Sequence, residues 1–313
     1  MNKLLFFSLY FFSFISFSQD TLSVKKDTSK WTLKTLYSLS GTQTTLSNWN
    51  AGGRTNVSVI GFISASAYYK TNRMKWENDV NLALGGIKYI DRTTSHENMQ
   101  KTDDRIDVSS KFGHHLNKSK YFSVIGGFKT QSLDGYNYPN DSVIISTFMA
   151  PGYINCAIGY DYVPSDNFGV FISPFATKMT FVKSQFLADK GAFGVDKAII
   201  NEVGEIIKKG KQFRGEFGAY FKIKWNKTVA KNIEMKSKLD LFSNYNQNPQ
   251  NIDVNAETIF TFKVNSWFSS SIQLNLVYDD DIMIKDSFGR TGPRTQFKSI
   301  IGMGISYSMK NFS

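Results

Sequence analysis

Charged side chains recur at every second position along several stretches of the chain, which is the spacing that places them on one face of a β-strand. Inside a closed barrel such residues either form ion pairs that fill the lumen or attract solutes into a channel, here with a slight preference for anions. The candidate lumen-lining residues are Glu77, Asp79, Arg105, Asp107, Lys111, Arg214, Glu216, Lys222, Lys224, Glu234, Lys236, Lys238, Asp240, Glu257 and Lys263.

The histidines bear on whether the chain carries an esterase site. A lipid-modifying barrel enzyme needs a serine or threonine nucleophile and a histidine base at its outer rim. The chain has only His96, His114 and His115. We expect His114 and His115 at the periplasmic end of a strand and His96 in the middle of a loop, next to Ser95 alone. The sequence therefore predicts no enzyme and no catalytic residue.

Two acidic runs offer oxygen ligands of the kind that Ca²⁺ prefers. They are Asp279-Asp280-Asp281 and Asp103-Asp104, each beside the outer end of a predicted strand. The alternative is a solvated, charged loop, and the spacing of an EF-hand loop is absent from the sequence. We favour the loop, and we expect neither a metal site nor a cofactor.

These residues lie within twelve segments that alternate apolar and polar residues or beside them, and the lengths of the segments suit transmembrane β-strands. The gaps between them are alternately long and short. This rhythm predicts an all-β fold, a closed antiparallel transmembrane barrel with short periplasmic turns, long extracellular loops and both termini in the periplasm. The predicted strands are 31–41, 56–69, 74–90, 102–116, 121–136, 148–161, 168–182, 213–225, 233–245, 254–267, 269–278 and 295–309.

The aromatic residues at the strand ends suggest two girdles at opposite rims of the barrel. By the parity of their strands, all of them are expected to face outward. Trp31, Trp76 and Trp225 belong to the short-turn end. Tyr89, Tyr136, Tyr245 and Tyr278 belong to the long-loop end.

Four local features qualify this pattern. Gly85-Gly86 and Pro174 each predict a bulge within a strand. The segment 196–209, in the longest gap, has apolar residues at helical spacing and favours a short amphipathic helix over an extended hairpin. Cys156, the single cysteine, is expected to be a small lipid-facing residue.

The N-terminus reads as a secretory signal peptide over residues 1–18, with a positive charge, an apolar run and small residues before Gln19. An uncleaved membrane anchor is the alternative. Residues 19–30 form a predicted periplasmic segment and residues 31–313 the barrel. No apolar run of helix-spanning length follows Gln19. The predicted location is the outer membrane.

The net charge of +11 is spread along the chain instead of gathering in one patch, which argues against nucleic-acid binding. Contact with the anionic head groups of outer-membrane lipids and lipopolysaccharide is the better interpretation. The last strand ends near Phe312. It resembles the C-terminal signal read by the barrel-insertion machinery, which is therefore an expected partner during biogenesis. The sequence does not indicate which other protein partners the barrel has.

The element Asn48-Trp49-Asn50-Ala51-Gly52-Gly53, after a first strand that opens at Trp31, resembles one family. It is an uncharacterised outer-membrane barrel family of the Bacteroidetes, which carries an Asn-Trp…Gly-Gly element near its start. The family-like loop residues are Asn48, Trp49, Gly52 and Gly53. The resemblance implies a barrel in the cell envelope and no activity.

The leading functional hypothesis from the sequence is a non-enzymatic barrel that acts as a small-solute channel or transport component. A sealed barrel that serves as an envelope scaffold or partner subunit is the alternative. A lipid-modifying enzyme is the third.

Overall fold

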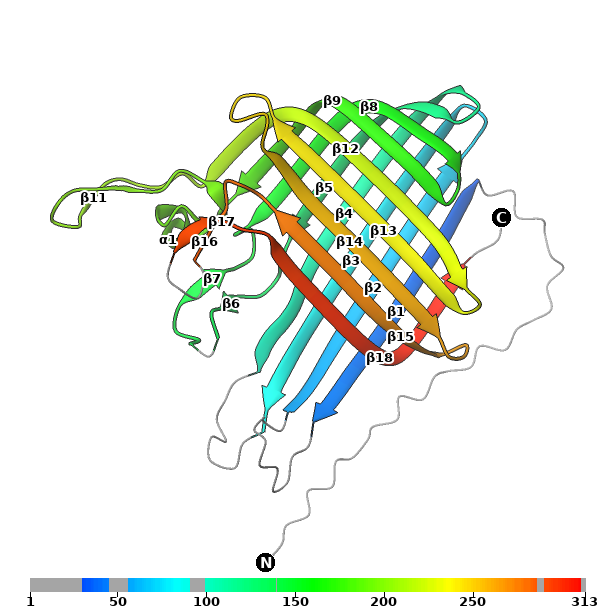
Figure 1. Ribbon diagram of the computed structural model, residues 1–313, viewed down its shortest axis with the longest axis horizontal. Coiled ribbons are helices and arrows are strands. Elements are labelled where there is room, and N and C mark those ends of the chain that lie inside the picture. The colour runs from blue at the N-terminus through cyan, green and yellow to red at the C-terminus, as the bar shows by residue number, and fades with distance from the viewer. Residues whose placement is uncertain (1–29, 45–55, 91–98, 139, 286–289, 311–313) are drawn as a thin grey trace, which may run out of the picture.

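The computed structural model describes residues 30–44, 56–90, 99–138, 140–285 and 290–310. Twelve strands form a closed antiparallel barrel in the order β1-β18-β15-β14-β13-β12-β9-β8-β5-β4-β3-β2 (Figure 1). The predicted fold class and strand number are confirmed. The barrel strands are β1 (Trp31–Thr44), β2 (Asn56–Lys70), β3 (Met74–Tyr89), β4 (Gln100–Asn117), β5 (Lys120–Thr130), β8 (Gly152–Ser165), β9 (Phe168–Phe181), β12 (Phe213–Ala230), β13 (Ile233–Asn244), β14 (Ile252–Lys263), β15 (Phe268–Tyr278) and β18 (Gln296–Lys310).

Short turns join the strands at one end of the barrel, here called the short-turn end, where β1 begins and β18 finishes. The opposite, long-loop end carries the remaining elements (Figure 1). These are β6 (Gly135–Tyr136), β7 (Ile144–Ser146), the helix α1 (Gln185–Asp189), the 3₁₀ turn η1 (Ala192–Gly194), β10 (Ile199–Ile200), β11 (Ile206–Lys208), β16 (Met283–Lys285) and β17 (Thr291–Pro293).

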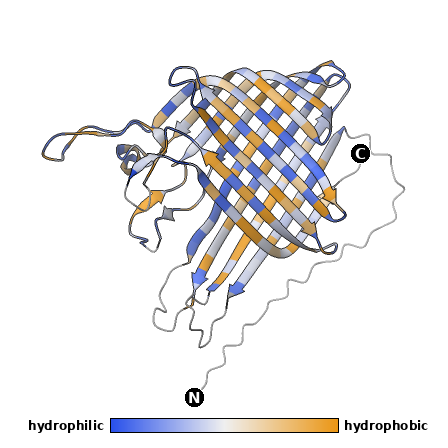
Figure 2. Cartoon of the chain, in the orientation of Figure 1, coloured by the Kyte–Doolittle hydropathy of each residue, from blue (hydrophilic) through white to orange (hydrophobic). Residues whose placement is uncertain are grey.

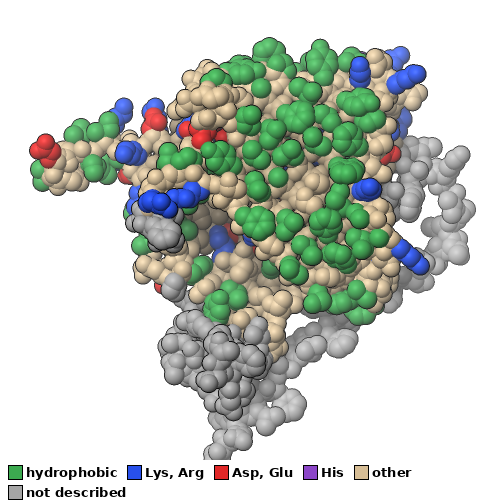
Figure 3. Space-filling view, in the orientation of Figure 1, with side chains coloured by type: hydrophobic (Ala, Val, Ile, Leu, Met, Phe, Trp, Pro, Cys, Tyr) green, Lys and Arg blue, Asp and Glu red, His purple; other side chains and the backbone are tan. Residues whose placement is uncertain are grey.

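Hydrophobic and hydrophilic residues alternate along the barrel strands (Figure 2). Because successive side chains of a strand point to opposite faces, the alternation gives the barrel an apolar and a polar face. On β3, Leu82 and Leu84 are exposed on the outer face, whereas Ala83 between them is buried. The space-filling view shows apolar side chains over the visible wall and basic ones near its ends (Figure 3). The described part of the chain has no helix long and apolar enough to cross a membrane.

Side-chain oxygens fix the short turns. Thr71 Oγ1 accepts hydrogen bonds from the backbone N–H groups of Arg73 and Met74, at 3.3 and 3.1 Å. Asn265 Oδ1 accepts from Trp267 and Phe268 in the turn between β14 and β15. Asn232 takes a positive φ of 68° in the turn between β12 and β13, a conformation that asparagine tolerates better than most residues. Backbone bonds from neighbouring strands add to these contacts, since the Arg73, Asn232 and Trp267 carbonyls accept from His115, Lys263 and Ser306.

The barrel closes where β1 pairs with β18, in a register that runs from Lys34↔Lys310 to Ser40↔Gly304. Gly304 lies so close to the neighbouring backbone that a Cβ atom there would collide with the carbonyl oxygen of Leu39. Only glycine therefore allows the two strands to approach closely at this point of the seam.

Both predicted irregularities lie at register shifts. The shift in β9 spans Ser173 and Pro174, and Ser173 Oγ replaces missing ladder bonds by accepting from the Phe175 N–H at 3.2 Å and contacting the Ile158 carbonyl at 2.8 Å. At Gly85–Gly86 the pairing with β4 shifts, but the extra residue, Thr102, belongs to β4. The pairing of β3 with β2 continues without a shift.

That uninterrupted pairing corrects the expected orientation of Tyr89. Because no residue is inserted into β3, Tyr89 keeps the parity opposite to that of Trp76 and lies on the inward side, opposite Asn56. Tyr136 is also not a girdle residue, since β5 ends at Thr130 and Tyr136 belongs to the small loop strand β6. The loop begins earlier than predicted because residues 131–134 form no ladder bonds with the barrel.

The other predicted girdle residues lie on the outward side of their strands or just beyond them. Trp31 contacts Trp76, with ring centroids 5.7 Å apart, at the short-turn end, where Trp225 is also exposed. At the long-loop end, Tyr245 packs edge-on against Phe217. Tyr278 pairs with Val254 on the outer face. Cys156 is exposed on the outer face of β8.

Several predicted boundaries were wrong. The strand predicted at 148–161 is Gly152–Ser165, because residues 147–150 form a separate turn closed by the Thr147–Ala150 bridge. The turn predicted at 226–232 is shorter, since β12 continues to Ala230. The strand predicted at 254–267 ends at Lys263, because Asn265 bonds the next turn.

The helix predicted over 196–209 was wrong, and the rival hairpin is correct. Strands β10 and β11 pair across a turn in which Gly204 has a φ of +89° and Asn201 Oδ1 accepts from the Val203 and Glu205 N–H groups. The base of this loop has its own small core of buried residues, which are Ala150, Val182, Leu187, Ala188 and Val195.

We expect Gly304→Val to prevent closure of the barrel, since the added side chain would displace β18 from β1. The measurement is the fraction of refolded protein that shows the heat-dependent shift of a folded barrel on a gel. Gly126→Val is the matched control, because a Cβ at Gly126 meets no atom within 4 Å. Equal folding of the two variants would contradict the close approach at the seam.

Candidate functional site

Inward side chains are buried on one side of the lumen and remain exposed or half-buried on the other. All fifteen predicted lumen-lining residues lie on the inward parity of their strands. Apart from Gly302 on β18, the buried residues of the described barrel strands belong to the arc from β3 through β4, β5, β8, β9 and β12 to β13. The remaining strands, β14, β15, β1 and β2, carry only exposed or half-buried side chains.

A cluster of charges fills the lumen toward the short-turn end. Here we call it the base cluster, and its centre is Asp161 on β8, whose side chain is 1% exposed. The Asp161 carboxylate contacts the Lys75 and Lys111 ammonium groups at 2.9 and 2.8 Å. Glu77 contacts the same two lysines at 3.2 and 3.4 Å. Burial of these charges is tolerable because each has a partner.

One arm of the base cluster crosses the barrel. Lys224 on β12 reaches Asp79 on β3, with the ammonium nitrogen 3.3 Å from the carboxylate oxygen. Four strands separate β12 from β3 on the shorter way around the ring. Asp79 also accepts hydrogen bonds from Ser66 and Tyr68 on β2, so its position is fixed on its own wall.

A second pair crosses the full width of the lumen. Arg105 Nη1 lies 2.8 Å from Glu257 Oε1, although β4 and β14 are separated by five strands in either direction. Arg105 also lies over the Phe62 ring of β2, at 5.8 Å. Glu257 accepts a further bond from Gln273 of β15, at 2.8 Å. We call these four residues the lumen bar.

The acidic residues at the long-loop end hold a lysine. Lys178 Nζ contacts Asp253 and Asp279 at 2.6 Å each and Glu216 at 3.8 Å. Asp253, Asp279 and Asp280 place carboxylate oxygens within 4.8 Å of one another. The Lys178 ammonium therefore already supplies the cation that this group of oxygens would attract. Asp279 is buried, so the solvated loop expected for the run 279–281 was wrong at this residue.

Arg214 at the start of β12 joins three loops. Its guanidinium donates to the Gly194 carbonyl at 2.7 Å, to Gln247 at 3.4 Å and to Asp281, which lies within ion-pair contact. It also contacts Glu216 at 3.2 Å. Burial, together with the carboxylates of Asp279 and Asp280, raises the pKa of Asp281 above its ordinary value despite the arginine. Arg214 thus ties together the three loops that carry Gly194, Gln247 and Asp281.

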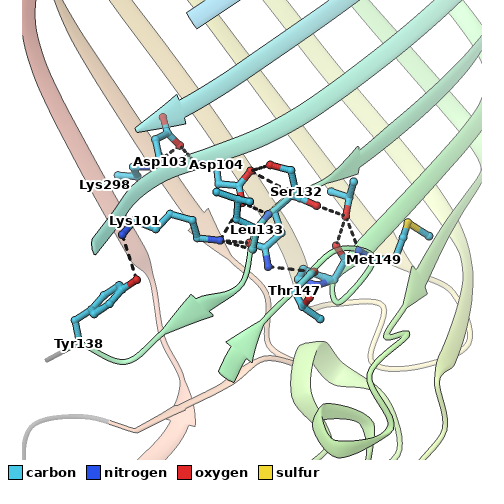
Figure 4. Close-up of polar contacts among 12 residues, drawn as sticks. Lys101, Asp103, Asp104, Ser132, Leu133, Tyr138, Thr147, Met149 and Lys298 are labelled. Atoms are coloured by element: carbon cyan, nitrogen blue, oxygen red, sulfur yellow. Dashed lines mark hydrogen bonds and ion pairs between the residues drawn. The ribbon is translucent and has the colours of Figure 1, made fainter. Parts of the chain in front are cut away.

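Asp104 anchors the loop that follows β5 in the same way (Figure 4). Its carboxylate accepts from the N–H and hydroxyl of Ser132, from the Leu133 N–H and from the Lys101 ammonium, all between 2.8 and 3.0 Å. Asp103 beside it contacts Lys298 of β18 at 2.9 Å. These two acids anchor backbone and lysines, so they form no open oxygen-rich site.

An apolar cluster and a cavity lie between the base cluster and the Lys178 group. The buried cluster consists of Ile125, Ala157, Phe171, Ala176 and Phe242, with Tyr220 packed against it. The cavity has a volume of about 260 Å³. It is lined by this apolar wall and by four lysines, Lys129, Lys178, Lys222 and Lys238.

On the side of the lumen formed by β15, β18 and β1, several inward positions are serines or glycines. Ser38 and Ser40 of β1, Ser269 and Ser271 of β15 and Ser306 of β18 lie on the inward parity, together with Gly302 and Gly304. Ser269 and Ser306 are joined by a 2.9 Å hydrogen bond. We call this surface the hydroxyl wall. Its serine side chains are half-buried, whereas many inward side chains of the charged arc are buried.

The other residues proposed from the sequence lie apart from these groups. Glu234 and Lys263 form a half-exposed pair, 2.6 Å apart, near the short-turn end. Lys236 is exposed, and His115 contacts Tyr121 at the short-turn end of β4, where His114 also lies. His96, the element Asn48, Trp49, Gly52 and Gly53, and the predicted signal peptide lie outside the described residues.

The sequence reasoning missed several residues of the site. Lys75, Lys129, Asp161 and Lys178 all belong to the ion-paired lumen, although the same two-residue alternation marks them as inward. The alternation of the sequence was therefore sufficient to identify these four residues as inward-facing. The apolar inward residues Ile125, Phe171 and Phe242 gave no such signal, because a hydrophobic residue in a strand suggests the lipid-facing side.

Two families match parts of the chain. One is described as a protein of unknown function (DUF3078) and matches residues 42–136, and the other, also of unknown function (DUF481), matches residues 194–287. These matches agree with an uncharacterised barrel family. No curated protein matches the chain.

Several solved outer-membrane barrels are similar at low sequence identity. The COG4313 outer membrane channel from Pseudomonas putida F1 has a TM-score of 0.39 and 11% identity, over 89% of this chain and 95% of its own. The translocator domain of the autotransporter NalP from Neisseria meningitidis has a TM-score of 0.33 and 9% identity, over 88% and 87%. The P. putida toluene transporter TodX has a TM-score of 0.29 and 9% identity, over 90% and 89%.

We expect Arg214→Ala to detach the long loops from the barrel rim. The change leaves Glu216 and Asp281 without their arginine, and removing one partner of a buried charge cluster is strongly destabilising. Amide hydrogen exchange of residues 192–196 and 279–283 should accelerate by about tenfold or more.

Lys211→Ala is the matched control for this change. It breaks the Lys211–Asp196 pair, in which both side chains are more than half exposed, although the hydrogen bond to Lys211 lowers the pKa of Asp196. An exposed pair contributes little, so exchange should change by less than about twofold. Similar exchange in both variants would refute the anchoring role of Arg214.

Proposed function

We propose that the protein spans the outer membrane and acts as a narrow, non-enzymatic channel for small polar solutes. The observation that carries the proposal is the uneven filling of the lumen. Charges and apolar groups pack the arc from β3 to β13, whereas the hydroxyl wall opposite is lined by small side chains that remain partly exposed. A path along that wall needs no rearrangement of the base cluster.

The exterior supports the membrane location. Outward residues such as Leu84, Phe175 and Ile301 are large and apolar, and at least half of each is exposed. Such a surface is stable only against lipid. The predicted signal peptide agrees with export. The partners that follow from this location are outer-membrane lipids, lipopolysaccharide and the barrel-insertion machinery.

The lumen bar is the proposed constriction of the path. Phe62, Arg105, Glu257 and Gln273 connect β2 to β15 through the middle of the barrel. The strands that remain on the other side of this bar are β18 and β1, with Ser38, Ser40 and Gly302 on their inward parity. A solute that follows the hydroxyl wall therefore passes between these small residues and the Arg105–Glu257 pair.

A sealed barrel that serves as a scaffold is the second candidate, and the lumen-crossing pairs Arg105–Glu257 and Lys224–Asp79 favour it. In that case the ordered long loops would be the contact surface. An enzyme is the weakest candidate, since His114 and His115 lie at the short-turn end.

Charge reversal of the lumen bar tests the channel. Arg105→Glu places two carboxylates opposite each other, and Glu257→Arg places two guanidinium groups there. Repulsion should open the constriction in each single variant and raise the single-channel conductance in planar bilayers by about twofold or more. The double variant restores an opposite pair, so its conductance should return toward that of the unmodified protein.

The same recordings separate the two candidate functions. Silence of the unmodified protein and of both single variants, with folding verified, would rule out the channel and leave the sealed barrel. An equal conductance in all four proteins would remove the lumen bar as the constriction.

Cysteine labelling tests where the path runs. In a Cys156→Ser background, Ser38→Cys and Ser271→Cys should react with a water-soluble, membrane-impermeant thiol reagent at least about tenfold faster than Ser123→Cys, because reaction requires access to the thiol. Ser123 is the matched control, since it is an inward serine that is 0% exposed. Equal rates at the three positions would contradict a path along the hydroxyl wall.

A further inference from the structure

The cavity beside the apolar cluster is separate from the path proposed above. Its lining residues come from β4, β5, β8, β9, β12, β13, β14 and β15, and none of them belongs to the hydroxyl wall. Its charges are distributed unequally. Lys178 lies near the rim and is held by Asp253 and Asp279 at 2.6 Å, so its hydrogen-bonding capacity is engaged.

The other three lysines of the cavity are loosely paired. Lys129 is 3.8 Å from Asp107, Lys222 is 3.7 Å from Asp240, and Lys238 is 3.4 Å from Asp240. Within the described part of the chain, none of the three ammonium groups donates a hydrogen bond. Ammonium groups normally satisfy three donors each, so this end of the cavity has donors to offer.

The acids of this end do not balance the lysines. Asp107 and Asp240 are two carboxylates against three ammonium groups, and Asp240 is also engaged by the Tyr220 hydroxyl in a close hydrogen bond. A single added negative charge would therefore make this end neutral. Desolvated ammonium groups with an unmatched charge are a strong attraction for an anion.

The remaining lining residues are mostly apolar, and Ser109, Asn155, Thr177 and Asn255 add neutral polar groups. Ile125, Ala157 and Ala176 line the cavity, together with Phe242, which lies one inward step from Asp240 on β13. An apolar cavity of ~150 Å³ can hold a benzene ring. The volume here, about 260 Å³, leaves room for such a ring and a charged group.

We propose that this cavity binds a small amphipathic anion, a carboxylate attached to an apolar body of about one ring. The carboxylate would accept hydrogen bonds from Lys129, Lys222 and Lys238, and the body would pack against Ile125, Ala157 and Phe242. The proposal goes beyond the channel, since binding does not require conduction.

Benzoate is the test ligand, and calorimetry on the mature protein in nanodiscs of zwitterionic lipid is the measurement. Benzyl alcohol and benzylamine have the same ring without the negative charge. We expect benzoate to bind with a dissociation constant below about 1 mM and at least about tenfold more tightly than either analogue. Preference for benzylamine would overturn the proposal, because it would assign recognition to the acids Asp253 and Asp279.

Variants locate the site. Lys222→Met and Lys238→Met keep an unbranched side chain of nearly the same length and remove the charge, so each should weaken benzoate binding at least about tenfold. Lys236→Met is the matched control, since Lys236 has the same parity on β13 but does not line the cavity. Equal affinity in the three variants would overturn the proposal.

Filling the cavity gives an independent test. Gly127 lines the cavity, and a Cβ there meets only the Val108 carbonyl oxygen, at 3.9 Å, so the side chain of Gly127→Leu can start without a clash and extend toward the cavity. This variant should fold and lose benzoate binding. Unchanged binding in folded Gly127→Leu, or no binding by the folded unmodified protein, would overturn the proposal whatever the conductance is.

Discussion

A charge that is desolvated inside a closed sheet needs a counter-charge, and many of the charges here find one on another strand of the same sheet. The closure of β1 on β18 turns every second residue of twelve strands toward one shared interior. Strand alternation alone decides which residues enter it, and desolvation then requires that the ionised ones be paired. The base cluster around Asp161, the lumen bar and the Lys178 group are three solutions to this one requirement.

Pairing across the lumen also shapes the interior. Arg105 and Glu257 reach each other at 2.8 Å from opposite walls because both side chains are long, and the pair divides the lumen into two sides. Large residues accumulate on one side and hydroxyl groups on the other. The proposed solute path follows the small residues on one side of the lumen, and the proposed anion site lies among the large residues on the other.

The sequence predicted the barrel because a two-residue alternation survives in each strand and is independent of distant partners. It predicted the inward parity of Arg105 and Glu257 for the same reason. It could not predict that they meet, since 152 residues separate them and their contact depends on the stagger of the whole sheet. The buried Phe171 and Phe242 were missed because alternation suggests a face but not which face is apolar.

The structure of the loops was harder to predict than that of the strands, because single residues within a loop decide where the chain reverses. In the segment 196–209 the apolar spacing favoured a helix, but Gly204 adopts a positive φ and Asn201 closes a turn around it, so the chain reverses. At Tyr89 the prediction failed because the extra residue of the bulge lies in the neighbouring strand, a distinction that only the pairing reveals.

The hairpin of β10 and β11 projects beyond the barrel rim from a loop base that has its own core (Figure 1). Ile199 and Lys208 begin and end the pairing, and beyond them the hairpin contributes nothing to the barrel wall. The residues of this hairpin can therefore be replaced by another sequence without loss of any barrel strand. A foreign peptide grafted between these two residues would be displayed away from the barrel, and doubling the loop length would cost only about 0.6 kcal/mol in closure entropy.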